Sequence, residues 1–136
     1  MVYVGVFGAF VVLFLLMFSQ EGPEMVASKF MSALVEGDPD KLTELSYFPS
    51  GTKKELRDQW EFSTKVAGKL YIFAWNIKFA KQADDKTVGV AMEVTRNAQS
   101  PASYPENYQL PLVKQDGKWL VDVSAISREM YPAMPK

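Results

Sequence analysis

Few residues of this chain could do chemistry, because its 136 residues include no histidine and no cysteine. Acid–base catalysis would therefore need a carboxylate beside a hydrogen-bond donor such as tyrosine. The candidates are Tyr47, Tyr71 and Trp75, with Glu93 or Asp122 as the carboxylate. Strand alternation leaves open whether either acid points inward, and aromatic residues at alternating positions usually form core. We therefore expect no catalytic residues and no enzymatic activity.

The sequence also offers few residues that could bind a metal or a cofactor. Without histidine or cysteine, a metal site would be built from oxygen ligands alone. The acidic pairs Asp38 with Asp40 and Asp84 with Asp85 are better explained as helix-cap and turn residues. The chain has 15 basic and 16 acidic residues, so it lacks the positive excess that nucleic-acid binding requires. We expect no metal, no cofactor and no nucleic-acid partner.

The most informative segment is an uncharged apolar run from Val2 to Phe18. As a helix it spans about 26 Å, slightly less than the hydrocarbon core of a bilayer at about 30 Å. A cleaved secretory signal is one alternative, but no basic residue precedes the run and no Ala-x-Ala pattern follows it. A core helix of a soluble fold is the other, but such apolar runs are usually shorter. We predict that residues 1–20 form a single-pass transmembrane anchor.

Three small residues, Gly5, Gly8 and Ala9, lie close to one face of that predicted helix. Small residues let a second membrane helix approach closely, although glycine is also common in membrane helices generally. Lys29 is the only basic residue near the run, so the positive-inside rule says little about orientation. The short N-terminal tail and the acidic Glu21 favour a domain on the periplasmic side of a bacterial inner membrane.

Residues 21–136 have the pattern of one domain that begins with helices. The first is expected from near Pro23 to Gly37, a short second one from Asp38, and a third from Thr52 to about residue 67. Thr52 and Glu55 have the spacing of a capping box. The helical period predicts these inward-facing residues: Met25, Val26, Phe30, Met31, Leu34, Leu42, Leu45, Leu56, Trp60, and Phe62 or Ser63.

After Gly68 the hydrophobic period changes to two, which predicts antiparallel strands. We expect them at residues 69–82, 87–96, 107–114 and 118–123. Pro111 suggests an edge strand or a bulge, and Asp116-Gly117 a tight hairpin turn. Residues expected to share a face within each strand are Tyr71, Phe73, Trp75, Ile77 and Phe79; Val88, Val90, Met92 and Val94; and Trp119, Val121 and Val123. The prediction is an α+β fold, with helices packed on a curved antiparallel sheet of about four strands.

Two segments of the domain resemble one known superfamily. The helix end FMSALVEGD at 30–38, with the leucines that follow at 42–45, and the closing hairpin LPLVKQDGKWLV at 110–121 are similar to nuclear transport factor 2-like proteins, also called cystatin-like α+β cones. The resemblance covers nearly everything after residue 23, and its motifs imply the fold and no activity. The superfamily includes isomerases and dehydratases, small-ligand binders and non-enzymatic assembly modules. Its enzymes commonly use an aspartate or an Asp-His pair, and this chain has no histidine.

Two short segments have the composition of a protein interface, which is often rich in aromatic residues and methionine. The loop at 97–108 carries Tyr104 and Tyr108, and the C-terminal segment at 128–135 carries Met130, Tyr131 and Met134. We expect these five residues to contact partners. The alternative is that both segments pack on their own domain.

These observations predict a non-catalytic accessory or scaffold subunit of a larger membrane complex, respiratory, photosynthetic or secretory, whose partners are other membrane protein subunits. The bitopic periplasmic subunit of type IV secretion systems has a comparable layout with a much longer cytoplasmic tail. The alternative function is a membrane-tethered binder of a small apolar ligand, in a cone lined by Tyr71, Phe73, Trp75 and Trp119. An isomerase- or dehydratase-type enzyme comes third.

Overall fold

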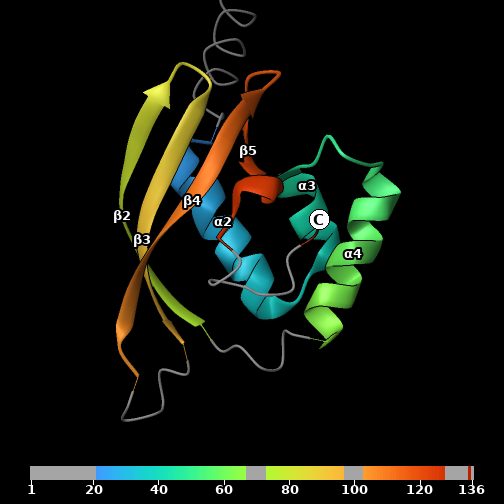
Figure 1. The fold of residues 1–136 in the computed structure, drawn as a ribbon, viewed down its shortest axis with the longest axis horizontal. Helices are drawn as coiled ribbons and strands as arrows, with labels where there is room; N and C mark the ends of the chain where they lie inside the picture. The colour runs from blue at the N-terminus through green and yellow to red at the C-terminus, as the bar shows by residue number, and fades with distance from the viewer. Residues whose placement is uncertain (1–20, 67–72, 97–102, 128–134, 136) are drawn as a thin grey trace, which may run out of the picture.

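The computed structural model describes residues 21–66, 73–96, 103–127 and 135. Three helices lie on one face of a curved sheet in this part of the chain (Figure 1), which confirms the α+β prediction. The elements are α2 (Pro23–Glu36), α3 (Pro39–Leu45), β1 (Ser46–Tyr47), α4 (Lys53–Val66), β2 (Phe73–Asp84), β3 (Thr87–Arg96), β4 (Pro105–Gln115), β5 (Lys118–Asp122) and a 3₁₀ turn (Val123–Ala125).

The anchor predicted at residues 1–20, with Gly5, Gly8 and Ala9, lies outside the described residues. Within the residues that the structure does describe, no helix is both long and apolar enough to cross a membrane.

The sheet has five strands in the order β1-β5-β4-β3-β2 and is mixed. Neighbouring strands are antiparallel except β1, which pairs parallel to β5 through Ser46 with Val121 and Tyr47 with Asp122. The prediction of about four antiparallel strands was therefore wrong by one strand. A two-residue strand is too short to produce a period-two pattern, so the sequence carries no signal for β1.

The junction between α2 and α3 follows the sequence closely. Gly37 ends α2 in the left-handed region at φ 69°, where its N–H reaches the Leu34 carbonyl and the Asp38 N–H reaches the Ala33 carbonyl. This is the usual glycine C-cap. The Asp38 carboxylate then accepts a hydrogen bond from the Lys41 N–H at 3.1 Å and caps α3.

Removing this cap should weaken the domain measurably. Asp38→Ala is expected to lower the free energy of unfolding by about 1 kcal/mol, because it leaves a helix N–H without its acceptor. Asp38→Asn keeps the acceptor and should stay within a few tenths of the native value in the same urea titration followed by circular dichroism. Equal losses for both variants would show that the cap contributes nothing.

The core lies between the helices and the inner face of the sheet. Phe30 of α2 meets Trp60 of α4 edge to face, with ring centroids 5.7 Å apart. The Trp60 indole donates a hydrogen bond to the Ser46 hydroxyl at 3.3 Å, and that hydroxyl donates to the Leu42 carbonyl. Apolar residues at most 6% exposed are Val26, Ala27, Phe30, Met31, Ala33, Leu34, Leu42, Leu56, Trp60, Val88, Val90, Met92, Val94, Leu110, Leu112, Val121, Val123 and Ile126.

Two helical residues depart from the expected core. Met25 is 54% exposed, because the buried stripe of α2 is centred one residue later, on Val26. In α4 either Phe62 or Ser63 was expected to face inward. Ser63 is the buried one, and Phe62 is 64% exposed. Ser63 lies three residues after Trp60, on the same helical face, whereas a residue two positions after Trp60 points away.

A bulge in β2 reverses the expected alternation. Trp75 pairs with Val94 and Ile77 with Met92, but the register with β3 shifts after Ile77, so that Phe79 pairs with Ala91. An extra residue in one strand turns all later side chains to the other face. Phe79 is consequently 56% exposed, and the prediction that it shares the inner face with Trp75 was wrong.

Pro111 lies in an interior strand, and the β3–β4 register opposite it is regular, so the prediction of an edge or a bulge was wrong. The Lys114 N–H bonds to the Lys86 carbonyl at 2.8 Å. Backbone N–H groups along a strand point alternately to its two neighbours. Because the Lys114 N–H points towards β3, the backbone nitrogen of Pro111, three residues earlier, points towards β5. The β4–β5 ladder ends at Leu112, and the missing N–H of Pro111 therefore breaks no pairing.

Candidate functional site

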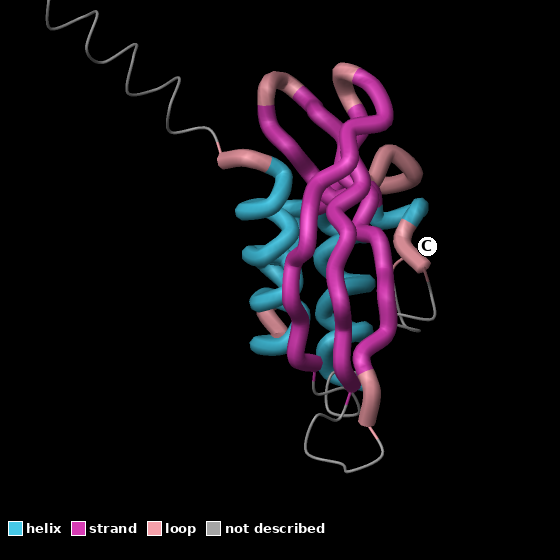
Figure 2. Tube along the Cα trace, turned by 90° about the vertical axis from the view of Figure 1, so that its left-hand side faces the viewer, coloured by secondary structure: helices cyan, strands magenta, loops and turns pink. Residues whose placement is uncertain are grey.

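The outer face of the sheet is not covered by any described helix (Figure 2). All three helices pack on the opposite face, and Figure 2 shows β2, β3 and β4 in front of them with no described helix crossing. Alternation defines which residues face outward, because Val88, Val90, Met92 and Val94 are buried on the inner side.

The centre of this outer face carries no charge. An antiparallel sheet with one solvated face normally presents polar residues there, but β3 presents Gly89 and Ala91 at its middle. Two paired rows extend these positions across three strands. One runs from Phe79 through Ala91 to Gln109, and the other runs from Lys81 on the edge strand through Gly89 to Pro111. We call the set the outer patch; it consists of Phe79, Gly89, Ala91, Gln109, Pro111 and Val113.

Gly89 and Gln109 fit together within the outer patch. A Cβ on Gly89 would lie 3.1 Å from Oε1 of Gln109, so the glutamine side chain extends across the glycine. A larger residue at position 89 would push this side chain away from the sheet. The glycine therefore keeps the patch flat where its two central rows meet.

Charged residues border the outer patch. Lys78 and Glu93 form an ion pair at 3.5 Å between β2 and β3, and Lys81 lies on the edge strand opposite Gly89. An uncharged centre with a polar rim is the usual composition of a protein–protein interface. The arrangement can bind another protein surface, and it offers no group that could attack or protonate a substrate.

The structure separates the predicted partner-contact residues. Tyr104 is 68% exposed just before β4 and is available to a partner. Tyr108 is half-buried on the inner face, and its hydroxyl donates a hydrogen bond to the Glu106 carboxylate. Met130, Tyr131 and Met134 lie outside the described residues, so their role stays a prediction.

Of the candidate acids and aromatic residues that the structure describes, it brings together only Tyr47 and Asp122, which are register partners of β1 and β5. Glu93 lies on the outer face, beside Lys78, and Asp122 ends β5, where it accepts a hydrogen bond from Ser124 at 3.3 Å. Trp75 packs against the core from the inner face. Tyr47 lies in β1 next to Asp122, and Tyr71 is outside the described residues.

One carboxylate–phenol pair was missed from the sequence. Glu106 and Tyr108 both face inward from β4, in the rows that contain Val94 and Met92. Counting back in twos from Leu110 along the strand would have placed both there. The expectation that strand three begins at residue 107 excluded Glu106, whereas β4 begins at Pro105.

The described titratable groups with clearly shifted pKa values lie on α4 and in the β2–β3 turn and are not members of the outer patch. A hydrogen bond from Lys65 lowers the pKa of Glu61 on α4, with Arg57 adding to the effect. The Lys86 backbone N–H lowers the pKa of Asp84 in the β2–β3 turn. Shifted groups of this kind stabilise helices and turns, and they mark no catalytic cluster.

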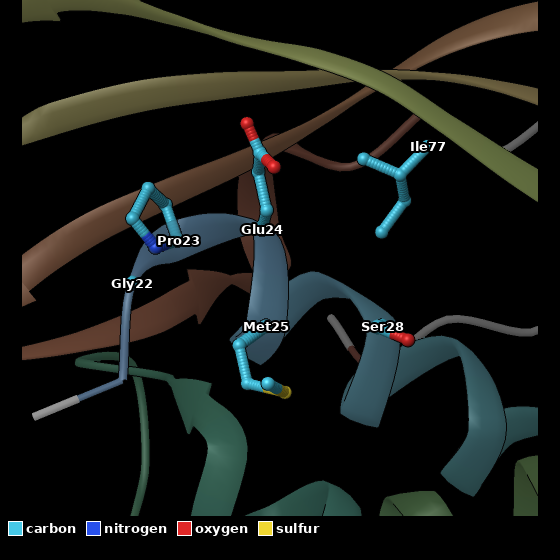
Figure 3. A pocket seen from close by; sticks show the side chains of 6 residues that line it. All are labelled: Gly22, Pro23, Glu24, Met25, Ser28 and Ile77. Atoms are coloured by element: carbon cyan, nitrogen blue, oxygen red, sulfur yellow. The ribbon is translucent and has the colours of Figure 1, made fainter. Parts of the chain in front are cut away.

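A hollow of about 570 Å³ lies beside the first turn of α2 (Figure 3). Figure 3 shows Glu24 pointing from the helix towards the sheet and Ile77 extending from β2. Its lining residues are Gly22, Pro23, Glu24, Met25, Ser28 and Ile77. One carboxylate and one hydroxyl do not form a recognisable catalytic set, and no cluster of three possible metal ligands occurs among the described residues.

Comparison with known proteins identifies the fold. No protein-family model matches the sequence, and no curated protein matches it. A structure from Thiobacillus denitrificans, described as a calcium/calmodulin-dependent protein kinase type II association domain, has a TM-score of 0.54 at 10% identity, over 75% of this chain and 90% of that one. An NTF-2 like protein of unknown function from Shewanella oneidensis has a TM-score of 0.50 at 14% identity, over 71% and 88%. The fold is NTF2-like.

A ketosteroid isomerase-like protein from Erwinia carotovora is also similar, with a TM-score of 0.49 at 22% identity, over 72% of this chain and 86% of that one. The NTF2-like fold confirms the resemblance noted in the helix end and the closing hairpin. Identities this low establish the fold alone, and the activity has to be argued from the site.

Proposed function

We propose that this chain is a non-catalytic subunit of a larger membrane protein complex, in which the outer patch binds another subunit. The observation that carries the proposal is the uncharged row from Phe79 through Ala91 to Gln109, on a sheet face that no described helix covers. Removing such a surface from water stabilises an assembly, and burying it costs no desolvation of charged groups.

The apolar run at residues 2–18 supports the membrane part of the proposal. A helix only about 26 Å long barely spans a bilayer, and partner helices packed on Gly5, Gly8 and Ala9 would compensate for this. The domain would then lie on the periplasmic side, against the extrinsic face of a respiratory, photosynthetic or secretory complex.

The described chemistry supports a non-catalytic role. Of the described candidates, Glu93 and Trp75 lie on opposite faces of the sheet, and the adjacent Tyr47 and Asp122 lie at the end of β1 and β5. The centre of the cone is filled by side chains such as Phe30, Trp60 and Met92. The fold does not decide the matter, because the similar structures are described variously as isomerase-like, as an association domain and as of unknown function.

The proposal is tested by extracting native membranes with a mild detergent and separating the extract by native electrophoresis. The full chain should migrate in one discrete assembly several times heavier than its own 15.3 kDa. It should also resist extraction of the membranes by alkaline carbonate, which releases peripheral proteins. Migration as a monomer after mild extraction would contradict the proposal.

The Glu106–Tyr108 pair favours a second function, the binding of an apolar ligand with one hydrogen-bonding end. The pair lies on the inner face in the same strand rows as Trp75 and Ile77. Sites of this kind are mostly apolar with a few convergent polar groups. If this is the function, Tyr108→Phe should weaken uptake of an apolar fluorescent probe about tenfold or less, whereas Phe79→Ser on the outer patch should leave it unchanged.

A further inference from the structure

A second surface, lined in part by the β4–β5 turn and the start of β5, is charged where the outer patch is uncharged. It is a groove of about 720 Å³ at the junction of the chain before α2, α3, the start of α4 and the β4–β5 turn. We call it the basic groove. Its lining residues are Glu21, Val26, Lys29, Lys41, Glu44, Leu45, Lys53, Gly117, Lys118, Trp119 and Leu120.

The basic groove concentrates positive charge on a chain that is slightly acidic. Four lysines against two glutamates give it an excess of two positive charges, whereas the whole chain has a net charge of −1. Lys29 pairs with Glu21. Among the described residues, Lys41, Lys53 and Lys118 have no ion pair, so three of the lysines that line the groove, each from a different element, are not neutralised by a carboxylate.

Trp119 supplies an aromatic wall to the basic groove. Nζ of Lys114, which is not among the lining residues, lies 5.7 Å from the centroid of the Trp119 ring. The hairpin turn through Asp116 and Gly117, both with positive φ, places Lys118 and Trp119 at the start of β5, with their side chains on opposite faces of the strand. Tryptophan beside lysine is the usual composition of a surface at the headgroup level of a membrane.

The basic groove is close in sequence to the apolar run, which indicates a ligand at the membrane surface. Glu21 lines it, and the apolar run ends at Phe18. Three residues reach at most about 11 Å even when extended. If the run lies in the bilayer, which is part of the proposed function, the groove is held within reach of the phospholipid headgroups.

We propose that the basic groove binds the phosphate groups of anionic phospholipids and thereby holds the domain against the membrane surface. Charge complementarity and the short connection to the apolar run both favour a lipid over a soluble phosphate compound. A tethered lysine near an anionic bilayer gains roughly a fivefold preference for it, so several lysines together produce a strong dependence on lipid charge.

The test uses the full chain reconstituted into vesicles of phosphatidylcholine alone or with about one third phosphatidylglycerol. Surface lysines are modified briefly with an amine-reactive reagent and quantified by mass spectrometry. On anionic vesicles the labelling of Lys41, Lys53 and Lys118 should fall about fivefold or more, and 0.5 M salt should restore it. Lys65 and Lys86, outside both the groove and the outer patch, serve as internal controls and should label equally on both vesicles.

Two variants with the same charge change sharpen the test. Lys53→Gln with Lys118→Gln should abolish the protection of Lys41, whereas Lys65→Gln with Lys86→Gln should leave it intact. Equal labelling of Lys41, Lys53 and Lys118 on neutral and anionic vesicles would overturn the proposal. It would also be overturned if inorganic phosphate alone protected these lysines on neutral vesicles. After labelling, the vesicles are washed at alkaline pH to test whether the chain is anchored in the bilayer. Release of the chain in this wash would contradict the proposed anchor. The labelling of the groove is measured independently, because it is complete before the wash.

Discussion

Trp60→Ala is expected to lower the free energy of unfolding by about 3–5 kcal/mol, the largest single-residue effect in the domain. Trp60 is fully buried, packs edge to face on Phe30, and donates its indole N–H to Ser46. Truncation would leave a large cavity between α2 and α4 and would leave the Ser46 hydroxyl without this donor. Urea unfolding of the full chain in detergent, followed by circular dichroism, measures the loss.

A matched control for this prediction comes from the same helix. Phe62 is also aromatic but 64% exposed, and Phe62→Ala should change the free energy of unfolding by no more than about 0.5 kcal/mol. Comparable losses for both variants would mean that α4 packs on the domain through a different face from the one described.

Ala91→Arg is expected to weaken assembly of the membrane complex about tenfold or more while the domain stays folded. Ala91 lies at the centre of the outer patch, between Phe79 and Gln109, and its side chain points away from the core. An arginine there would be desolvated without a partner in the interface. Co-purification of the chain with its complex, normalised to the membrane content of the chain, gives the measurement.

The same change at an exposed site outside the outer patch provides the control. Ala125 lies in the 3₁₀ turn and is exposed, so Ala125→Arg should leave both assembly and stability unchanged. Loss of assembly with both variants, or with neither, would contradict a binding role for the outer patch.

The regular parts of the fold could be predicted because their signals are local. Asp38, Gly37 and Asp116-Gly117 each act within a few residues, through a cap or a positive φ, and the structure has them where the sequence indicates. The inward face of β3 likewise follows from strict alternation, and all four of its predicted core residues are buried.

The departures have physical causes that the sequence does not display. The bulge after Ile77, which exposes Phe79, depends on the pairing partner of β2, and β1 exists only because it meets β5. The outer patch was missed for a related reason. Its residues come from three strands, and their uncharged character becomes visible only when the register sets Gly89 against Pro111.

Photocrosslinking from Gln109 measures whether the outer patch contacts another subunit. A photoreactive residue at this exposed position of the outer patch, in the full chain in its native membrane, should yield a discrete adduct with a different protein of the same complex. The same residue at Asp58, exposed on α4, should yield none. Binding of another subunit at the outer patch would be contradicted by any of three results: no adduct from Gln109, equal adducts from both positions, or an adduct only between two copies of this chain.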